Sequence, residues 1–265
     1  MRLKNKVVLI TASTRGIGLA CVTSCAKEGA IVYMAARNLE LAKDISLSLN
    51  KQGYNVKYVY NDATKPETFS SMIKEVIQNE GHLDVLVNNF GTSNPKKDLD
   101  FANTMIDDFL DIVNINLKSV FLSSQEAARF MASFGGGSII NISSIGGIVP
   151  DVSQVAYGTS KAAINYLTKL IASQEAHNNI RCNAVLPGMT RTEALDKNLS
   201  DDFKDLFIRH IPLNRIGLPE EIASAVVYFA SDESAYTTGQ ILAISGGFGL
   251  TTPIYGEVIN KNNKR

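Results

Sequence analysis

Tyr157 and Lys161 have the residue types and the spacing to move a proton. Four positions apart on a helix, they lie on one face, so the ammonium stands one turn from the phenol. A free phenol has a pKa of about 10, and a fixed positive charge nearby favours the phenolate and lowers that pKa. The pair therefore predicts a tyrosine that serves as acid and base near neutral pH. A solvated helix face is the alternative interpretation of this spacing.

Ser144 and Asn116 are the other two candidate catalytic residues. Ser144 follows the apolar run 138–142, which is typical of a buried strand, and its hydroxyl could hold the oxygen of a carbonyl or an alcohol. Asn116 falls in the middle of a predicted helix, where asparagine is a poor helix former. Its side chain either caps or kinks that helix, or its amide holds a water molecule that passes protons to Lys161.

These residues are positioned by a chain that alternates short β-branched runs with longer helical patterns. Strands that are apolar throughout predict an α/β fold, with a parallel sheet covered by helices on both faces and ligands bound beyond the carboxyl ends of the strands. The predicted strands are 7–10, 31–34, 56–60, 85–87, 138–142, 180–185 and 241–244, and the predicted helices are 17–28, 39–52, 66–80, 104–132, 153–177 and 219–231.

The loop between the first strand and the first helix has the composition of a phosphate-binding turn. Its small residues let the backbone approach a pyrophosphate, and the helix N-terminus supplies amide donors and a positive dipole end. An ordinary glycine turn is the alternative, because Ala12 stands where a dinucleotide fingerprint has its first glycine. The expected cofactor contacts in this loop are Thr11, Ser13, Thr14, Arg15, Gly16, Ile17 and Gly18.

The end of the second strand bears on the choice between the two nicotinamide cofactors. It reads Arg37-Asn38, with no acidic residue to bind the ribose 2′-hydroxyl of NAD. An arginine favours a 2′-phosphate, and Arg15 in the neighbouring loop is a second cation. We therefore expect NADP rather than NAD. A solvated charge at a strand end is the alternative for Arg37.

Polar residues also follow the third and fourth strands, as Asn61-Asp62-Ala63 and Asn88-Asn89-Phe90-Gly91. Both segments lie on the same expected edge of the sheet and can line an adenosine site. Asp62, with Ala63 beside it, would accept a hydrogen bond from the adenine amino group, and Asn89 and Gly91 would border the ribose. As ordinary turn formers, these residues would have no such role.

Composition narrows the class of protein. With 265 residues, 45% of them apolar and 20% charged, the chain suits one globular domain, 1–265. Its 26 basic and 26 acidic residues give no reason to expect a nucleic acid or membrane partner. The 3 cysteines lack metal-ligand spacing, so no metal is expected, and Cys21 and Cys25 suit the core of one helix. Without a signal peptide or membrane span, we expect a cytoplasmic protein.

Taken together, these motifs resemble the short-chain dehydrogenase/reductase family across nearly the whole chain. The resemblance implies a doubly wound Rossmann domain with a seven-stranded parallel sheet, nicotinamide-dependent interconversion of alcohols and ketones, and a homotetramer formed through helices 104–132 and 153–177. It assigns the acid-base role to Tyr157, the carbonyl-oxygen contact to Ser144, the ribose contact and the pKa effect to Lys161, and the proton relay to Asn116. Pro187-Gly188 belongs to the pattern, and Thr190 and Thr192 match positions that contact the nicotinamide carboxamide and phosphate.

A narrower resemblance is to bacterial 7α-hydroxysteroid dehydrogenases that act on bile acids, in particular an NADP-using branch with arginine at the position of Arg37. It rests on Thr14–Gly18, Asn88–Gly91, Arg181–Gly188, Pro212–Arg215 and the tail Thr252-Pro-Ile-Tyr255, in which Ile254 interrupts the pattern. The resemblance implies a bile acid or steroid as the small-molecule substrate. The C-terminal tail 248–265 is expected to help close the substrate pocket.

Segment 189–211 is expected to lie over the site as a lid. Its apolar residues would provide a wall for a sterol, or would pack a helix against its own core: Met189, Leu195, Leu199, Phe203, Leu206, Phe207 and Ile208.

Two other functions remain open. A 3-oxoacyl-thioester (acyl carrier protein) reductase shares the motifs, but the lid has 4 basic and 5 acidic residues and so offers no basic rim for an acidic carrier. A non-catalytic NADP-sensing protein is disfavoured by the presence of Ser144, Tyr157 and Lys161.

Overall fold

The computed structural model describes residues 1–193, 195, 200–252 and 254–262. Its central sheet has 7 strands in the order β3-β2-β1-β4-β5-β6-β7, and every neighbouring pair is parallel. The parallel sheet predicted from the apolar runs is confirmed. The strands are β1 (Val7–Thr11), β2 (Ile31–Ala36), β3 (Asn55–Tyr60), β4 (Val85–Asn88), β5 (Gly137–Ile142), β6 (Ile180–Pro187) and β7 (Ile241–Ile244).

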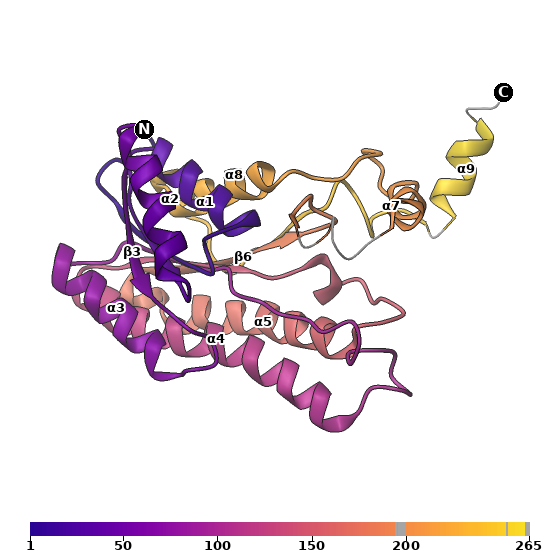
Figure 1. Cartoon of the computed structure of the whole chain (residues 1–265), viewed down its shortest axis with the longest axis horizontal. Helices are drawn as coiled ribbons and strands as arrows, with labels where there is room; N and C mark the ends of the chain where they lie inside the picture. The colour runs from indigo at the N-terminus through magenta and orange to yellow at the C-terminus, as the bar shows by residue number, and fades with distance from the viewer. Residues whose placement is uncertain (194, 196–199, 253, 263–265) are drawn as a thin grey trace.

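Helices cover both faces of this sheet (Figure 1). One layer contains α1 (Gly16–Lys27), α2 (Leu39–Lys51) and α8 (Pro219–Ala230), and the other contains α3 (Glu67–Glu80), α4 (Ile106–Ser133) and α5 (Val155–Gln174). The order of the strands places β1 beside β4, so the chain reverses its direction of winding there. In such sheets the ligand binds outside the carboxyl ends of the strands at this reversal.

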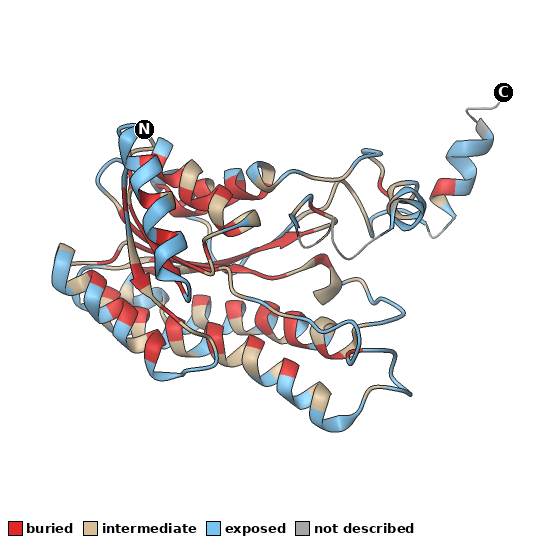
Figure 2. Ribbon diagram, in the orientation of Figure 1, coloured by how far each residue is buried: buried red, intermediate tan, exposed pale blue. Residues whose placement is uncertain are grey.

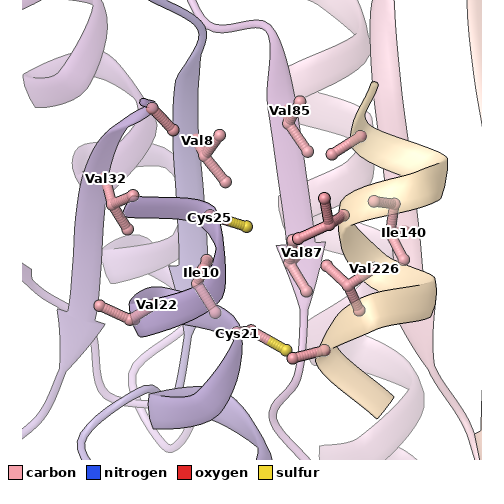
Figure 3. Packing of buried hydrophobic residues seen from close by; sticks show 14 of the residues in the cluster. Val8, Ile10, Cys21, Val22, Cys25, Val32, Val85, Val87, Ile140 and Val226 are labelled. Atoms are coloured by element: carbon pink, nitrogen blue, oxygen red, sulfur yellow. The ribbon is translucent and has the colours of Figure 1, made fainter. Parts of the chain in front are cut away.

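The core consists of two apolar clusters, one on each face of the sheet. In the first, Cys21 and Cys25 of α1 pack with Val226 of α8 against valine and isoleucine side chains of the strands (Figure 3). These cysteines are small core residues, as predicted, and both are free thiols. Figure 2 shows that the buried residues gather on the sheet and on the helix faces turned toward it. The sheet is thus a rigid support for the loops at its edge.

Two further helices lie outside the predicted helix ranges, although a helix within the lid was one of the two interpretations of its apolar pattern. α7 (Asp201–Ile208) and α9 (Tyr255–Asn262) lie together at one end of the molecule (Figure 1). Apolar side chains of both helices stay partly exposed, among them Phe203, Leu206 and Val258. Short 3-10 turns occur at Ile145–Gly147, Ala176–Asn178 and Asp232–Ser234. In the part of the chain that the structure describes, no helix has the length and apolar character to cross a membrane, and no group of metal-ligating side chains is found.

Candidate active site

A pocket of about 260 Å³ lies beyond the carboxyl ends of β4, β5 and β6. Because these strands are neighbours and parallel, the segments that follow them meet at one edge of the sheet. Helix α5 contributes its first two turns to the same pocket. The predicted residues in its wall are Ile17, Asn89, Gly91, Ser144, Tyr157, Lys161, Pro187, Gly188, Thr190 and Thr192.

Tyr157 and Ser144 form the centre of this pocket. Tyr157 is half-buried in the first turn of α5, and Ser144 is the residue before the 3-10 turn that leads away from β5. The Ser144 hydroxyl accepts a hydrogen bond of 3.1 Å from the amide of Gly146. Burial raises the pKa of Tyr157, and its hydrogen bond with Ser144 opposes that rise. The expectation that the pKa of Tyr157 is lowered is therefore wrong for the protein alone, in which the phenol is protonated at neutral pH.

Lys161 is a buried cation, 2% exposed, which rules out the solvated-face interpretation. Its Nζ donates to the carbonyl oxygen of Ile142 at 3.0 Å and lies 5.6 Å from the centre of the Tyr157 ring. Burial lowers the pKa of Lys161 to about 8. The ammonium is thus held against a backbone carbonyl and an aromatic ring, and desolvation outweighs charge stabilisation for both members of the pair.

Asn116 is fully buried on α4, with its side chain committed to partners in the chain. Its Oδ1 accepts from the amide of Thr92 at 2.8 Å, and its Nδ2 donates to the Thr92 carbonyl at 2.9 Å. The same Nδ2 donates to Ser160 Oγ at 3.0 Å. Both amide hydrogens are used within the chain, so a relay water could be held only through Oδ1, and the relay role of Asn116 stays a prediction. Asn116 ties the segment after β4 to α4 and α5.

The loop between β1 and α1 adopts the conformation of a glycine turn despite Ala12, which has a φ of 51°. Gly18 packs so closely that a Cβ would lie 2.6 Å from the Ala12 carbonyl oxygen. Thr11 Oγ1 accepts from the amides of Asn89 and Phe90 at 2.9 and 3.1 Å. This buried hydroxyl therefore joins β1 to β4, and a contact of Thr11 with a cofactor stays a prediction. Thr14 and Gly16 are partly exposed beside it.

Ser13 is the unusual residue of this loop. It is fully buried, and its hydroxyl has no hydrogen-bond partner. A buried polar group without a partner is costly, so such a group in a native structure needs an explanation. The hydroxyl lies just before α1, whose N-terminus has no side-chain cap. There it could donate a hydrogen bond to a phosphate oxygen of a dinucleotide.

Arg15 and Arg37 are both exposed at the carboxyl edge. They follow β1 and β2, which pair in parallel with Thr11 opposite Ala35. Among the described residues, neither arginine side chain has a hydrogen-bond or ion-pair partner. Arg37 helps to lower the pKa of Asp62, after the larger effect of the hydrogen bonds from Thr64. Two cations without an ion pair thus flank the place where the ribose of a dinucleotide is expected.

Asn38 and Asp62 are partly occupied by local hydrogen bonds. Asn38 caps α2, because its Oδ1 accepts from the amide of Leu41 at 3.1 Å. Asp62 Oδ1 accepts from the amide and hydroxyl of Thr64 at 3.0 and 2.8 Å. Ala63, next to Asp62, packs on the core. Asp62 therefore does form a turn, which was the alternative interpretation of its segment. Among the described residues, Asn38 Nδ2 and Asp62 Oδ2 make no hydrogen bond.

A larger pocket of about 630 Å³ adjoins the first and shares Met189 with it. Sequence reasoning missed most of its wall, which includes Ile145, Ile148 and the segment Ser245–Leu250. The signal was available, because residues 245–250 follow a predicted strand and so lie at the same edge. Phe207 of α7 stacks on Phe248 with ring centres 4.5 Å apart. The lid thus contacts the pocket through Phe207, whereas Phe203 and Leu206 stay exposed. Leu199 of the lid and Pro253 of the tail lie outside the described residues.

Known proteins resemble the chain over almost its full length. A family described as "Enoyl-(Acyl carrier protein) reductase" matches residues 11–249. A 7alpha-hydroxysteroid dehydrogenase of Clostridium sardiniense is 50% identical over 256 residues, covering 97% of this chain and 98% of that protein. One from Paraclostridium sordellii is 48% identical over 259 residues, 97% of each chain. A 3-oxoacyl-[acyl-carrier-protein] reductase of Thermotoga maritima is 37% identical over 252 residues, covering 93% of this chain and 99% of that protein.

A solved structure shares the fold. It is a 7 alpha-hydroxysteroid dehydrogenase complexed with NADH and 7-oxo glycochenodeoxycholic acid, with a TM-score of 0.88, 30% identity, and coverage of 93% of this chain and 95% of that one. Fold, pocket and relatives together define an oxidoreductase with a nicotinamide cofactor. The chain belongs to the short-chain dehydrogenase/reductase family.

Proposed function

We propose that this enzyme is an NADP(H)-dependent 7α-hydroxysteroid dehydrogenase, which interconverts the 7α-hydroxyl group and the 7-ketone of bile acids. The proposal is supported by two relatives of that name at 50% and 48% identity. The structural observation that carries it is the junction at Met189 of two pockets, one holding Ser144 and Tyr157 and the other large and mostly apolar.

The larger pocket suits a rigid sterol. Ile145, Ile148, Val149, Leu213 and Phe248 supply apolar wall, and burying apolar surface contributes about 25 cal/mol per Å². A flexible acyl chain bound to a carrier protein needs a narrow channel and a basic rim instead, since carrier proteins are acidic. The volume of about 630 Å³ next to the reactive pocket therefore favours the steroid over the thioester.

NADP is favoured over NAD by Arg15 and Arg37. Both are exposed, neither has an ion-pair partner in the described chain, and both stand at the adenosine end of the expected site. An arginine can hold a 2′-phosphate through two parallel hydrogen bonds. Asn38, Asp62 and Ala63 would border the adenosine, Asn89 and Gly91 the ribose, and Thr190 and Thr192 the nicotinamide end after Pro187-Gly188.

The residues of the chain would then share the chemistry as follows. The nicotinamide, when bound, supplies or accepts the hydride at the reacting carbon. Ser144 holds the oxygen of the ketone, and the protonated Tyr157 gives that oxygen its proton during reduction. In oxidation Tyr157 must first lose its own proton, and it then takes the proton of the 7α-hydroxyl. Lys161 holds the ribose and, once the site is filled, favours the phenolate.

We also propose that residues 1–265 form one domain, which works as a homotetramer in the cytoplasm. Helices α4 and α5 pack together and leave apolar side chains exposed, among them Leu110, Phe121 and Tyr166. Such a surface is typical of contacts between subunits. The three cysteines are buried free thiols, as suits a reducing compartment. Light scattering of the purified protein would give the number of subunits.

The decisive experiment follows nicotinamide absorbance with NADP⁺ and, separately, with NAD⁺. The substrates are a 7α-hydroxylated bile acid, its 7β epimer and a 3-hydroxyacyl thioester. We expect the enzyme to turn over only the 7α compound, and to do so with NADP⁺ but not with NAD⁺. Reaction of the thioester alone would overturn the steroid assignment, and binding of NADP without any turnover would favour a sensing protein.

A further inference from the structure

Asp98 is a carboxylate that is almost fully buried, with 1% of its surface exposed. It belongs to the loop between β4 and α4, yet both of its oxygens accept hydrogen bonds from α5. Oδ1 accepts from the amide of Ala156 at 2.8 Å, and Oδ2 accepts from the amide of Tyr157 at 2.9 Å. A buried carboxylate is retained only where its charge is compensated. Here the compensation comes from the first turn of the helix that carries Tyr157.

Helix α5 has no cap of its own. The residue before it, Gln154, has a φ of 60° and a side chain that makes no capping hydrogen bond, and the first turn contains no acidic residue. The amide of Val155 donates to the carbonyl oxygen of Leu99 at 3.2 Å. The first three amides of α5 are therefore all satisfied by residues 98 and 99. The negative charge also complements the positive end of the helix dipole.

The same loop is attached to the active site at its other end. Thr92 is held by Asn116, which also donates to Ser160 of α5. Gly91 lies so near Lys161 that a Cβ on it would be 2.8 Å from Nζ. Segment 91–99 thus runs along the side of α5 that carries Lys161 and Tyr157. It contacts that helix at Lys161 through Gly91 and at Tyr157 through Asp98.

From this arrangement we propose that Asp98 is a positioning residue for the reaction, which fixes Tyr157 by holding its backbone amide. The inference rests on the proposed function of Tyr157 as the proton donor. When the first turn of a helix frays, a phenol carried on that turn moves with it. A displacement of 1 Å at a reacting group can lower the rate about 100-fold. Without Asp98 the phenol loses its fixed distance from Ser144.

The test compares Asp98→Ala, Asp98→Asn and the control Asp100→Asn. Asp100 lies two residues further along the loop and is exposed, and among the described residues its carboxylate accepts only from Ala102 and Asn103 in its own turn. We expect kcat to fall about 10- to 100-fold in Asp98→Ala. It should fall less in Asp98→Asn, which keeps one acceptor oxygen, and stay within about 2-fold in the control. KM and the Kd of NADPH should stay within about 2-fold of wild type, because Asp98 does not line the pocket.

Hydrogen exchange of a peptide spanning 155–160 measures the cap without any substrate. Its exchange should be about 10-fold faster in Asp98→Ala than in wild type or in Asp100→Asn. Unchanged exchange would overturn the cap, and faster exchange with unchanged kcat would overturn the positioning role. If wild type oxidises no alcohol and reduces no ketone, the proposed function falls and the catalytic part of this inference falls with it. The exchange experiment still decides whether Asp98 caps α5.

Discussion

The ammonium of Lys161 lies 5.6 Å from the centre of the Tyr157 ring, and both side chains belong to one turn of α5. In the protein alone this proximity does not produce a phenolate, because burial raises the pKa of Tyr157 and lowers that of Lys161 to about 8. The resting site therefore holds a neutral phenol that is ready to donate a proton to a ketone. Oxidation has to begin with loss of that proton.

Replacing Tyr157 by phenylalanine should remove the proton donor and leave the fold intact. We expect kcat for reduction of the 7-ketone to fall by about 10²- to 10⁴-fold, the usual contribution of a positioned acid or base. The Kd of NADPH, measured by fluorescence titration, should change little. Tyr236→Phe is the control, since Tyr236 is fully exposed and lies outside the pocket and outside helices α4 and α5. Substantial remaining activity in Tyr157→Phe would mean that another group supplies the proton.

Arg37→Ala should weaken the binding of NADPH and leave that of NADH unchanged. A charge-assisted hydrogen bond is worth about 1.5–3 kcal/mol, so the Kd of NADPH should rise about 10- to 100-fold. Lys43→Ala, which removes an exposed cation from the neighbouring helix α2, is the control. Isothermal titration with both cofactors measures the effect. Equal loss of affinity for NADPH and NADH would show that Arg37 does not bind the 2′-phosphate.

Lys161 should make the stability of the cofactor-free protein depend on pH. Its pKa is about 8 in the folded chain, against 10.5 for an ordinary lysine. Between these values the unfolded chain binds more protons, so this residue's contribution to the free energy of unfolding rises as the pH increases. Below pH 8, Lys161 is protonated in both the folded and the unfolded chain, so the full free-energy cost of burying its charge remains.

Urea unfolding of wild type and Lys161→Met at several pH values within that window measures this contribution. The difference between the two proteins cancels the effects of the buried cysteines, and it should grow in favour of wild type as the pH rises. Lys169→Met, which changes an exposed lysine on the same helix, should show no such trend. A difference that stays constant with pH would contradict a lowered pKa for Lys161.

Asn116→Ala should destabilise the fold through the loop after β4. The substitution removes three hydrogen bonds, two to Thr92 and one to Ser160. At about 1 kcal/mol for each bond, the free energy of unfolding should fall by about 2–3 kcal/mol. Asn114→Ala, an exposed position on α4, should cost less than about 0.5 kcal/mol. Equal stability of the two variants in urea would mean that water replaces the lost partners.

The sequence alone determined the sheet, its helical layers and the edge at which the site lies, because these follow from local patterns. Apolar runs mark buried strands, and the residues just after parallel strands must gather at one edge. The spacing of Tyr157 and Lys161 on one helix placed their side chains on one face, and the glycine-rich loop indicated a dinucleotide.

Only the tertiary structure decided the pKa shifts of these residues and their hydrogen-bond partners. The direction of the pKa shifts depends on burial, and burial is a property of the whole fold. The partners of Asn116 lie 24 and 44 residues away along the chain, and Asp98 reaches Tyr157 across 59 residues. No local pattern carries such contacts, because they arise only when the loop after β4 is laid along α5.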